Sequence, residues 1–72
     1  MKADEIQLLQ KLTERGGVMT PSAWEIAQSI GMPYKRARYI LQNKWICKGW
    51  YEYGVSWGTG WLTEEAPPVH VL

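Results

Sequence analysis

The stretch that decides the fold runs from Thr20 to Trp45 and reads TPSAWEIAQSIGMPYKRARYILQNKW. Its first half carries small and apolar residues at helical spacing, at Ala23, Ile26, Ala27 and Ile30. Gly31 then interrupts the pattern, and only Met32 and Pro33 stand between it and the first periodic residue of a second helix, which is expected over 33–47. Two short helices joined through a tight glycine turn are typical of a helix-turn-helix motif.

The start of the first of these helices has two candidates. Thr20 could cap the helix with Pro21 in the first turn, or Ser22 and Glu25 could form a capping box. We favour Thr20. In the second helix, Ala37, Ile40, Leu41 and Trp45 are expected to face the core.

The flanking segments complete a single small domain over 1–66. A helix is predicted over 3–15, with Ile6, Leu9 and Leu12 facing inward, Leu8 broadening that face, and glycines at its end. Aromatic residues interrupted by glycines predict a hairpin with strands near 50–53 and 60–63. The remaining residues, 67–72, are expected to be a flexible C-terminal tail.

This order of elements resembles the winged helix-turn-helix superfamily, and within it the small fimbrial-switch regulators of the Pap and Fae type. The matching words are EIAQSIG, Tyr34, ARYIL over 37–41 and KG at 48–49, and the likeness covers roughly residues 20–63. The resemblance implies an α+β fold of three helices and a two-stranded wing. It also implies a bacterial or phage transcriptional regulator, with helix 33–47 in the major groove and hairpin 50–63 as the wing. The fimbrial type further implies a co-regulator that acts with a larger DNA-bound protein.

The charge distribution also bears on DNA binding. The net charge is only +1, yet no acidic residue lies between Glu25 and Glu52, where five cations fall: Lys35, Arg36, Arg38, Lys44 and Lys48. Such a centre indicates either an anion-binding face or an ordinary solvated helix. Its position in a helix-turn-helix favours the anion-binding face.

The helical period assigns separate roles to the side chains of helix 33–47. On the outer face are Tyr34, Lys35, Arg38, Tyr39 and Gln42. Arg38 could bind guanine through two hydrogen bonds, Gln42 could pair with adenine, and the tyrosines could contact phosphate or a thymine methyl. Arg36 and Lys44 lie towards the flanks and are expected to contact phosphate.

Trp57 is expected near the tip of the hairpin, where it either contacts DNA, a second subunit or another protein, or packs back onto the wing. The loop around it, GVSWGTG, contains no Lys or Arg, which departs from a wing that binds phosphate. An alternative function is therefore a protein–protein interaction module that does not bind DNA itself. The expected partners are double-stranded DNA and, with it, a larger DNA-bound regulator or a second copy of the chain.

Other classes of protein are disfavoured. Cys47 has no second cysteine with which to pair, and no apolar run approaches the ~20 residues that span a bilayer, so we expect a cytoplasmic protein without membrane contact. The single His and single Cys disfavour a metal site, and no phosphate loop or other cofactor site is evident. Without an oriented nucleophile–base pair, the chain is not expected to be an enzyme.

Overall fold

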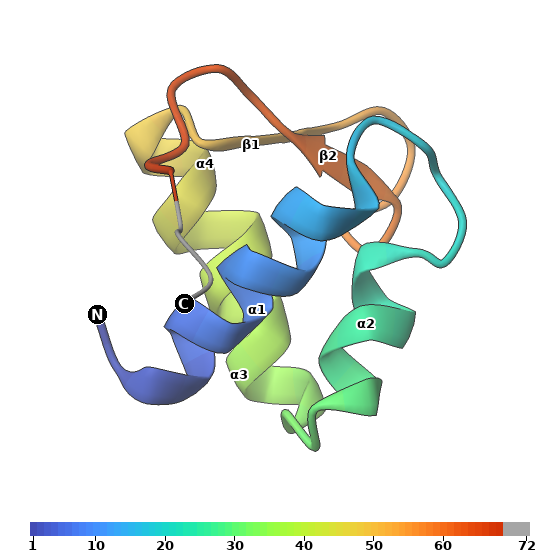
Figure 1. Ribbon diagram of the computed structural model, residues 1–72, viewed down its shortest axis with the longest axis vertical. Helices are drawn as coiled ribbons and strands as arrows, with labels where there is room; N and C mark the ends of the chain where they lie inside the picture. Colours follow the sequence, from blue (N-terminus) through green and yellow to red (C-terminus); the bar gives the residue numbers. More distant parts are fainter. Residues whose placement is uncertain (69–72) are drawn as a thin grey trace.

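Three helices pack against one another, and an antiparallel hairpin lies across one end of them in the computed structural model (Figure 1). The structure describes residues 1–68, so most of the predicted tail, 69–72, lies outside the described residues. The elements are α1 (Ala3–Arg15), α2 (Ala23–Ser29), α3 (Tyr34–Arg38), the π-helical η1 (Tyr39–Lys44), α4 (Trp45–Lys48), β1 (Tyr51–Tyr53) and β2 (Gly60–Leu62). The predicted α+β class, with three helices followed by a two-stranded hairpin, is confirmed.

The buried face of α1 is rotated from the predicted one. Leu8, Leu9 and Leu12 are buried, whereas Ile6 is 40% exposed, so the inward placement of Ile6 was wrong. The fourth buried residue of the stripe is Glu5. Positions 5, 8, 9 and 12 follow the i, i+3, i+4, i+7 spacing of a helix face. A charged residue therefore occupies the position at which an apolar pattern would begin.

The N-terminus of α2 is set by Ser22 rather than by Thr20, so the favoured start was wrong. The Ser22 hydroxyl accepts from the Glu25 backbone N–H at 3.1 Å, and the Ser22 backbone N–H donates to the Glu25 carboxylate at 3.4 Å. This reciprocal capping box satisfies two backbone donors at the helix start, which a Thr20 cap two residues earlier would leave open.

The turn between α2 and α3 depends on Gly31, which has φ of +74°. Only glycine adopts this conformation at low cost. After it, the Met32 N–H donates to the Ala27 carbonyl at 2.9 Å, and the Met32 side chain is buried. The turn therefore closes α2 and starts α3 within a few residues.

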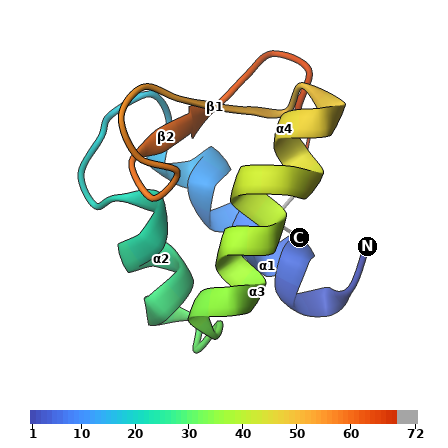
Figure 2. The same ribbon diagram turned by 180° about the vertical axis from the view of Figure 1, so that it is seen from behind.

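The segments α3, η1 and α4 form one continuous helix over 34–48, here called the long helix (Figure 2). Its predicted span was 33–47. The middle portion is π-helical, and the Trp45 N–H donates to the Ile40 carbonyl five residues earlier. Ala37, Ile40, Leu41 and Trp45 are fully buried, as expected from their spacing.

The hairpin pairs Tyr51 with Leu62, Glu52 with Trp61 and Tyr53 with Gly60. Its strands are a residue shorter than predicted at the outer ends. Gly60 is required at its position, because a Cβ there would come within 2.5 Å of the Tyr51 ring. The glycine thus lets the Tyr51 side chain pack beneath the opposite strand.

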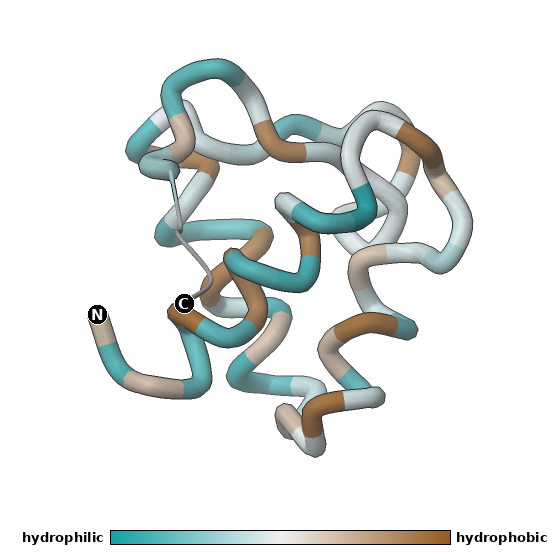
Figure 3. Tube along the Cα trace, viewed as in Figure 1, coloured by the Kyte–Doolittle hydropathy of each residue, from teal (hydrophilic) through white to brown (hydrophobic). Residues whose placement is uncertain are grey.

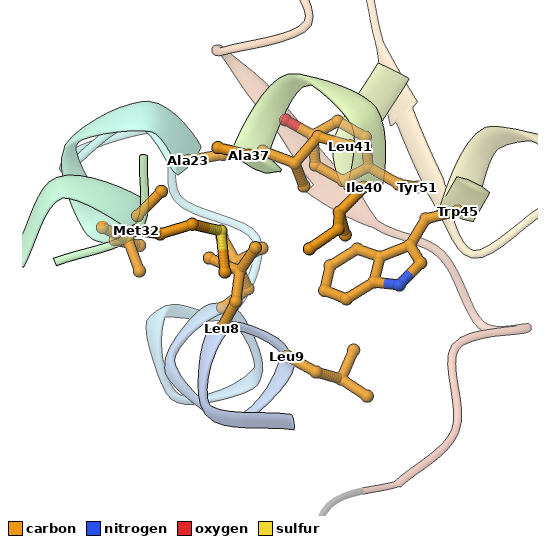
Figure 4. Packing of buried hydrophobic residues seen from close by; sticks show 12 residues of the cluster. Leu8, Leu9, Ala23, Met32, Ala37, Ile40, Leu41, Trp45 and Tyr51 are labelled. Atoms are coloured by element: carbon orange, nitrogen blue, oxygen red, sulfur yellow. The ribbon is translucent and has the colours of Figure 1, made fainter. Parts of the chain in front are cut away.

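The core lies where the three helices face one another. Figure 3 shows hydrophobic stretches of the helices there, and a further hydrophobic stretch in the outer turn between α1 and α2, where Val18 and Met19 are exposed. Figure 4 shows Leu8 and Leu9 of α1 directed towards the side chains of the long helix, with the Trp45 indole beside Ile40. Tyr51 adds the hairpin to this cluster. The core therefore fixes the long helix against α1 and leaves its opposite face in solvent.

Candidate nucleic-acid interface

The solvent face of the long helix brings together the predicted outer residues. Tyr34, Lys35, Arg38 and Tyr39 are exposed and Gln42 is half-buried. They line one shallow hollow of about 440 Å³ together with Asn43. We call this set the outer face. The predicted exposure agrees with the structure for four of these residues, Gln42 is only partly exposed, and the contact of all five with DNA stays a prediction.

Arg38 and Gln42 act on the outer face as a pair. The Arg38 Nε–H donates to the Gln42 side-chain oxygen at 2.8 Å, one helical turn away. This bond holds the guanidinium along the helix and leaves its terminal nitrogens without another hydrogen bond among residues 1–68. Sequence reasoning assigned these two residues separate bases. The structure instead presents one preorganised group of amide and guanidinium donors.

Arg36 on the flank is engaged by α1. Its Nε and Nη2 donate to the two carboxylate oxygens of Asp4 at 2.8 and 2.9 Å. The hydrogen bonds from Arg36 lower the pKa of Asp4 to about 2, and the same contact raises the pKa of Arg36. Both groups are therefore firmly charged near neutral pH, and their charges cancel locally.

Lys44 on the other flank is engaged by Glu5. The Glu5 side chain is 0% exposed, and it accepts from Lys44 Nζ at 2.8 Å and from Trp45 Nε1 at 3.1 Å. Burial raises the pKa of Glu5, but the hydrogen bonds from Lys44 and Trp45 and the lysine charge outweigh burial, so the net shift is downward. This carboxylate anchors the long helix, where η1 meets α4, to the first turn of α1.

These two ion pairs reduce the charge available to a polyanion. Of the five cations between residues 25 and 52, two are paired with acids of α1, which leaves Lys35, Arg38 and Lys48. Lys48 lies at the far end of the long helix, 4.9 Å from the centre of the Trp50 ring. The outer face itself therefore carries two cations, Lys35 and Arg38, and no acidic residue.

Trp57 packs against helices rather than projecting from the hairpin tip. Its ring is 6.0 Å from Trp24 of α2 and 5.3 Å from Tyr34 of α3, and those two rings are 5.2 Å apart. We call these three residues the aromatic cluster. The backbone N–H of Trp24 also donates to the Gly58 carbonyl at 3.1 Å. The hairpin loop is thereby held beside the start of the outer face, and Trp57 is half-buried instead of exposed.

Three residues near this face were missed by sequence reasoning. Asn43 lines the hollow, and its place one turn beyond Tyr39 was the available signal. Asp4 and Glu5 of α1 were not among the predicted site residues, and they neutralise the flank cations Arg36 and Lys44. Only the helical register of Glu5 with the buried leucines could have indicated its burial.

Comparison with known proteins finds no match to a family model, a curated protein or a solved structure. Within residues 1–68, no helix has both the length and the apolar character needed to cross a membrane. The same part of the chain contains no cluster of three or more His, Cys, Asp or Glu residues suited to a metal ion.

The pair between Asp4 and Arg36 predicts a specific acid dependence of stability. Because folding lowers the pKa of Asp4 from 3.8 to about 2, its contribution is present above pH 3.8 and is lost as the pH falls towards 2. Melting temperatures of wild type and Asp4→Asn should differ by at most about 5 °C at neutral pH, since the pair is partly exposed. Circular dichroism melts should show that difference vanishing near pH 2. A difference that stays constant down to pH 2 would contradict the assigned pairing.

Proposed function

We propose that this protein is a small DNA-binding transcriptional regulator or co-regulator of the winged helix-turn-helix type. In this proposal the long helix enters the major groove and the hairpin serves as the wing. The observation that carries it is the outer face, where the hydrogen-bonded Arg38–Gln42 pair shares one hollow with two exposed tyrosines and Lys35, and no acidic residue lines that hollow. The proposed role is non-enzymatic and cytoplasmic.

The chemistry of the outer face suits base edges. Arg38 retains its terminal guanidinium donors for the O6 and N7 atoms of guanine, and the Gln42 amide nitrogen can donate to a neighbouring base. Tyr34, Tyr39 and Lys35 flank the pair and can contact phosphates, which set the position of the helix in the groove.

The few unpaired cations limit the affinity of one copy. With Arg38 on a base edge, Lys35 is the outer-face cation left for phosphate, and one engaged phosphate gives a slope of log affinity against log salt of about −0.9. Such a shallow slope corresponds to weak binding at physiological salt. Useful affinity then requires a second copy on a paired half-site or a larger DNA-bound regulator, and both remain proposed partners.

The test is binding of Arg38→Ala to duplex DNA. We expect a loss of about 1–3 kcal/mol, roughly five-fold to 150-fold in affinity for a selected site, because base contacts from the guanidinium are removed. The control is Lys11→Ala, which removes the same charge from an exposed position on α1. Fluorescence anisotropy gives both affinities, and NMR shifts with a 16-base-pair duplex locate the contact. Equal binding by the two variants would refute the proposed interface.

The alternative of a protein–protein interaction module draws on the hairpin loop. The loop carries no cation, and it is folded onto helices with Trp57 and Tyr34 only partly covered. An aromatic surface of this kind suits a protein partner. A folded wild-type protein with no NMR shifts on any duplex at low salt would favour this alternative.

A further inference from the structure

Arg36 lies on the flank of the outer face with its binding groups already occupied. It precedes Tyr39 by three residues on the long helix and interacts electrostatically with Tyr39, so it sits at the Tyr39 edge of the surface proposed to meet DNA. Two of its nitrogens bind the two oxygens of the Asp4 carboxylate, at 2.8 and 2.9 Å. A guanidinium binds a phosphate in this same two-pronged geometry. Asp4 therefore occupies Arg36 as a phosphate would.

The two acids of α1 differ in how firmly they hold their cations. Glu5 is fully buried and also bound to Trp45, so its contact with Lys44 is part of the core. The Asp4 and Arg36 side chains are instead 41% and 26% exposed. Exposed pairs of this kind contribute only about 0–1 kcal/mol. A DNA phosphate on this flank can thus compete with Asp4 for Arg36.

We propose that Asp4 is an internal competitor for phosphate, which holds Arg36 off DNA and so limits the number of phosphates that the long helix engages. This inference rests on the proposed DNA-binding function. Asp4 acts through Arg36 and touches no base itself. In the wild-type protein this competition between Asp4 and phosphate lowers the nonspecific affinity for DNA. Base contacts from the outer face then account for a larger share of the binding free energy.

The test compares Asp4→Asn with Glu14→Gln on a fixed 16-base-pair duplex by fluorescence anisotropy, from 50 to 200 mM salt. Both substitutions remove one negative charge from α1, but among residues 1–68 the only ion pair of Glu14 is with Lys11, at 4.0 Å. Release of Arg36 to one phosphate should steepen the salt slope of Asp4→Asn by about 0.9 and tighten binding about threefold to tenfold at 100 mM salt. Glu14→Gln should retain the wild-type slope.

Arg36→Ala provides the second arm. Because Arg36 is withheld in wild type, its removal should leave the salt slope unchanged, and Asp4→Asn combined with Arg36→Ala should lose the added 0.9. Circular dichroism melts confirm that each variant is folded at the binding temperature.

The outcomes separate the inference from the function on which it rests. If the salt slope of Asp4→Asn equals that of Glu14→Gln, or if Asp4→Asn binds more weakly than wild type, the inference is overturned. The proposed function still stands in that case, provided that the wild-type protein binds the duplex. A steeper slope that persists in the double variant also overturns it, because the gain then does not come from Arg36. If neither the wild-type protein nor any variant binds the duplex at low salt, the proposed function is refuted, and the inference is refuted with it.

Discussion

Replacing Glu5 with Gln is expected to lower the free energy of unfolding by about 3 kcal/mol. Breaking one partner of a buried ion pair typically costs about 3–5 kcal/mol, because the remaining charge loses its compensation. Here the value should lie at the low end, since the Lys44 side chain is 32% exposed and can turn towards water. The Gln amide can still accept from the Trp45 indole, but its N–H groups oppose the lysine.

Urea unfolding followed by tryptophan fluorescence measures this effect. Glu14→Gln is the matched control, because its side chain is about half exposed and pairs only loosely with Lys11, and it should change stability by less than about 0.5 kcal/mol. A loss below about 1 kcal/mol for Glu5→Gln would mean that the buried carboxylate does not anchor the long helix. Such a result would also mean that the Glu5 ion pair does not explain why the buried face of α1 is rotated from the predicted one.

Trp57→Ala is expected to cost about 2–3 kcal/mol of stability. A fully buried Trp→Ala change costs about 3–5 kcal/mol, and Trp57 is only half-buried. The substitution removes two edge-to-face contacts, with Trp24 and Tyr34, each worth about 0.5–1.5 kcal/mol. The start of the outer face should loosen as a result, which the Tyr34 ring resonances will report by NMR.

Val55→Ala serves as the control in the same loop, because Val55 is 100% exposed and should be silent in both measurements. The two interpretations of Trp57 now make different predictions. If Trp57 chiefly braces the hairpin against the helices, stability falls and the Tyr34 resonances shift. If it were chiefly a contact for a partner, stability would be nearly unchanged while binding of that partner was lost.

Local patterns were enough to predict most of the secondary structure. The spacing of Ala37, Ile40, Leu41 and Trp45 predicts their burial, because a helix repeats its faces every 3.6 residues. Aromatic runs broken by glycines likewise predicted the hairpin and the ends of its strands to within one residue, but not their register. The same helical period predicted the outer face, because it is the side of the long helix that does not pack against the core.

The contacts that the charged side chains and the large aromatic side chains make depend on residues far away in the sequence. Asp4 meets Arg36 across 32 positions, and Glu5 meets Lys44 across 39. Trp57 meets Trp24, which lies 33 positions earlier in the sequence. Periodicity reports which side of an element is apolar, but it carries no information on which element lies opposite. Burial of a carboxylate and neutralisation of a cation both depend on that pairing, so they arise only when α1, the long helix and the hairpin come together.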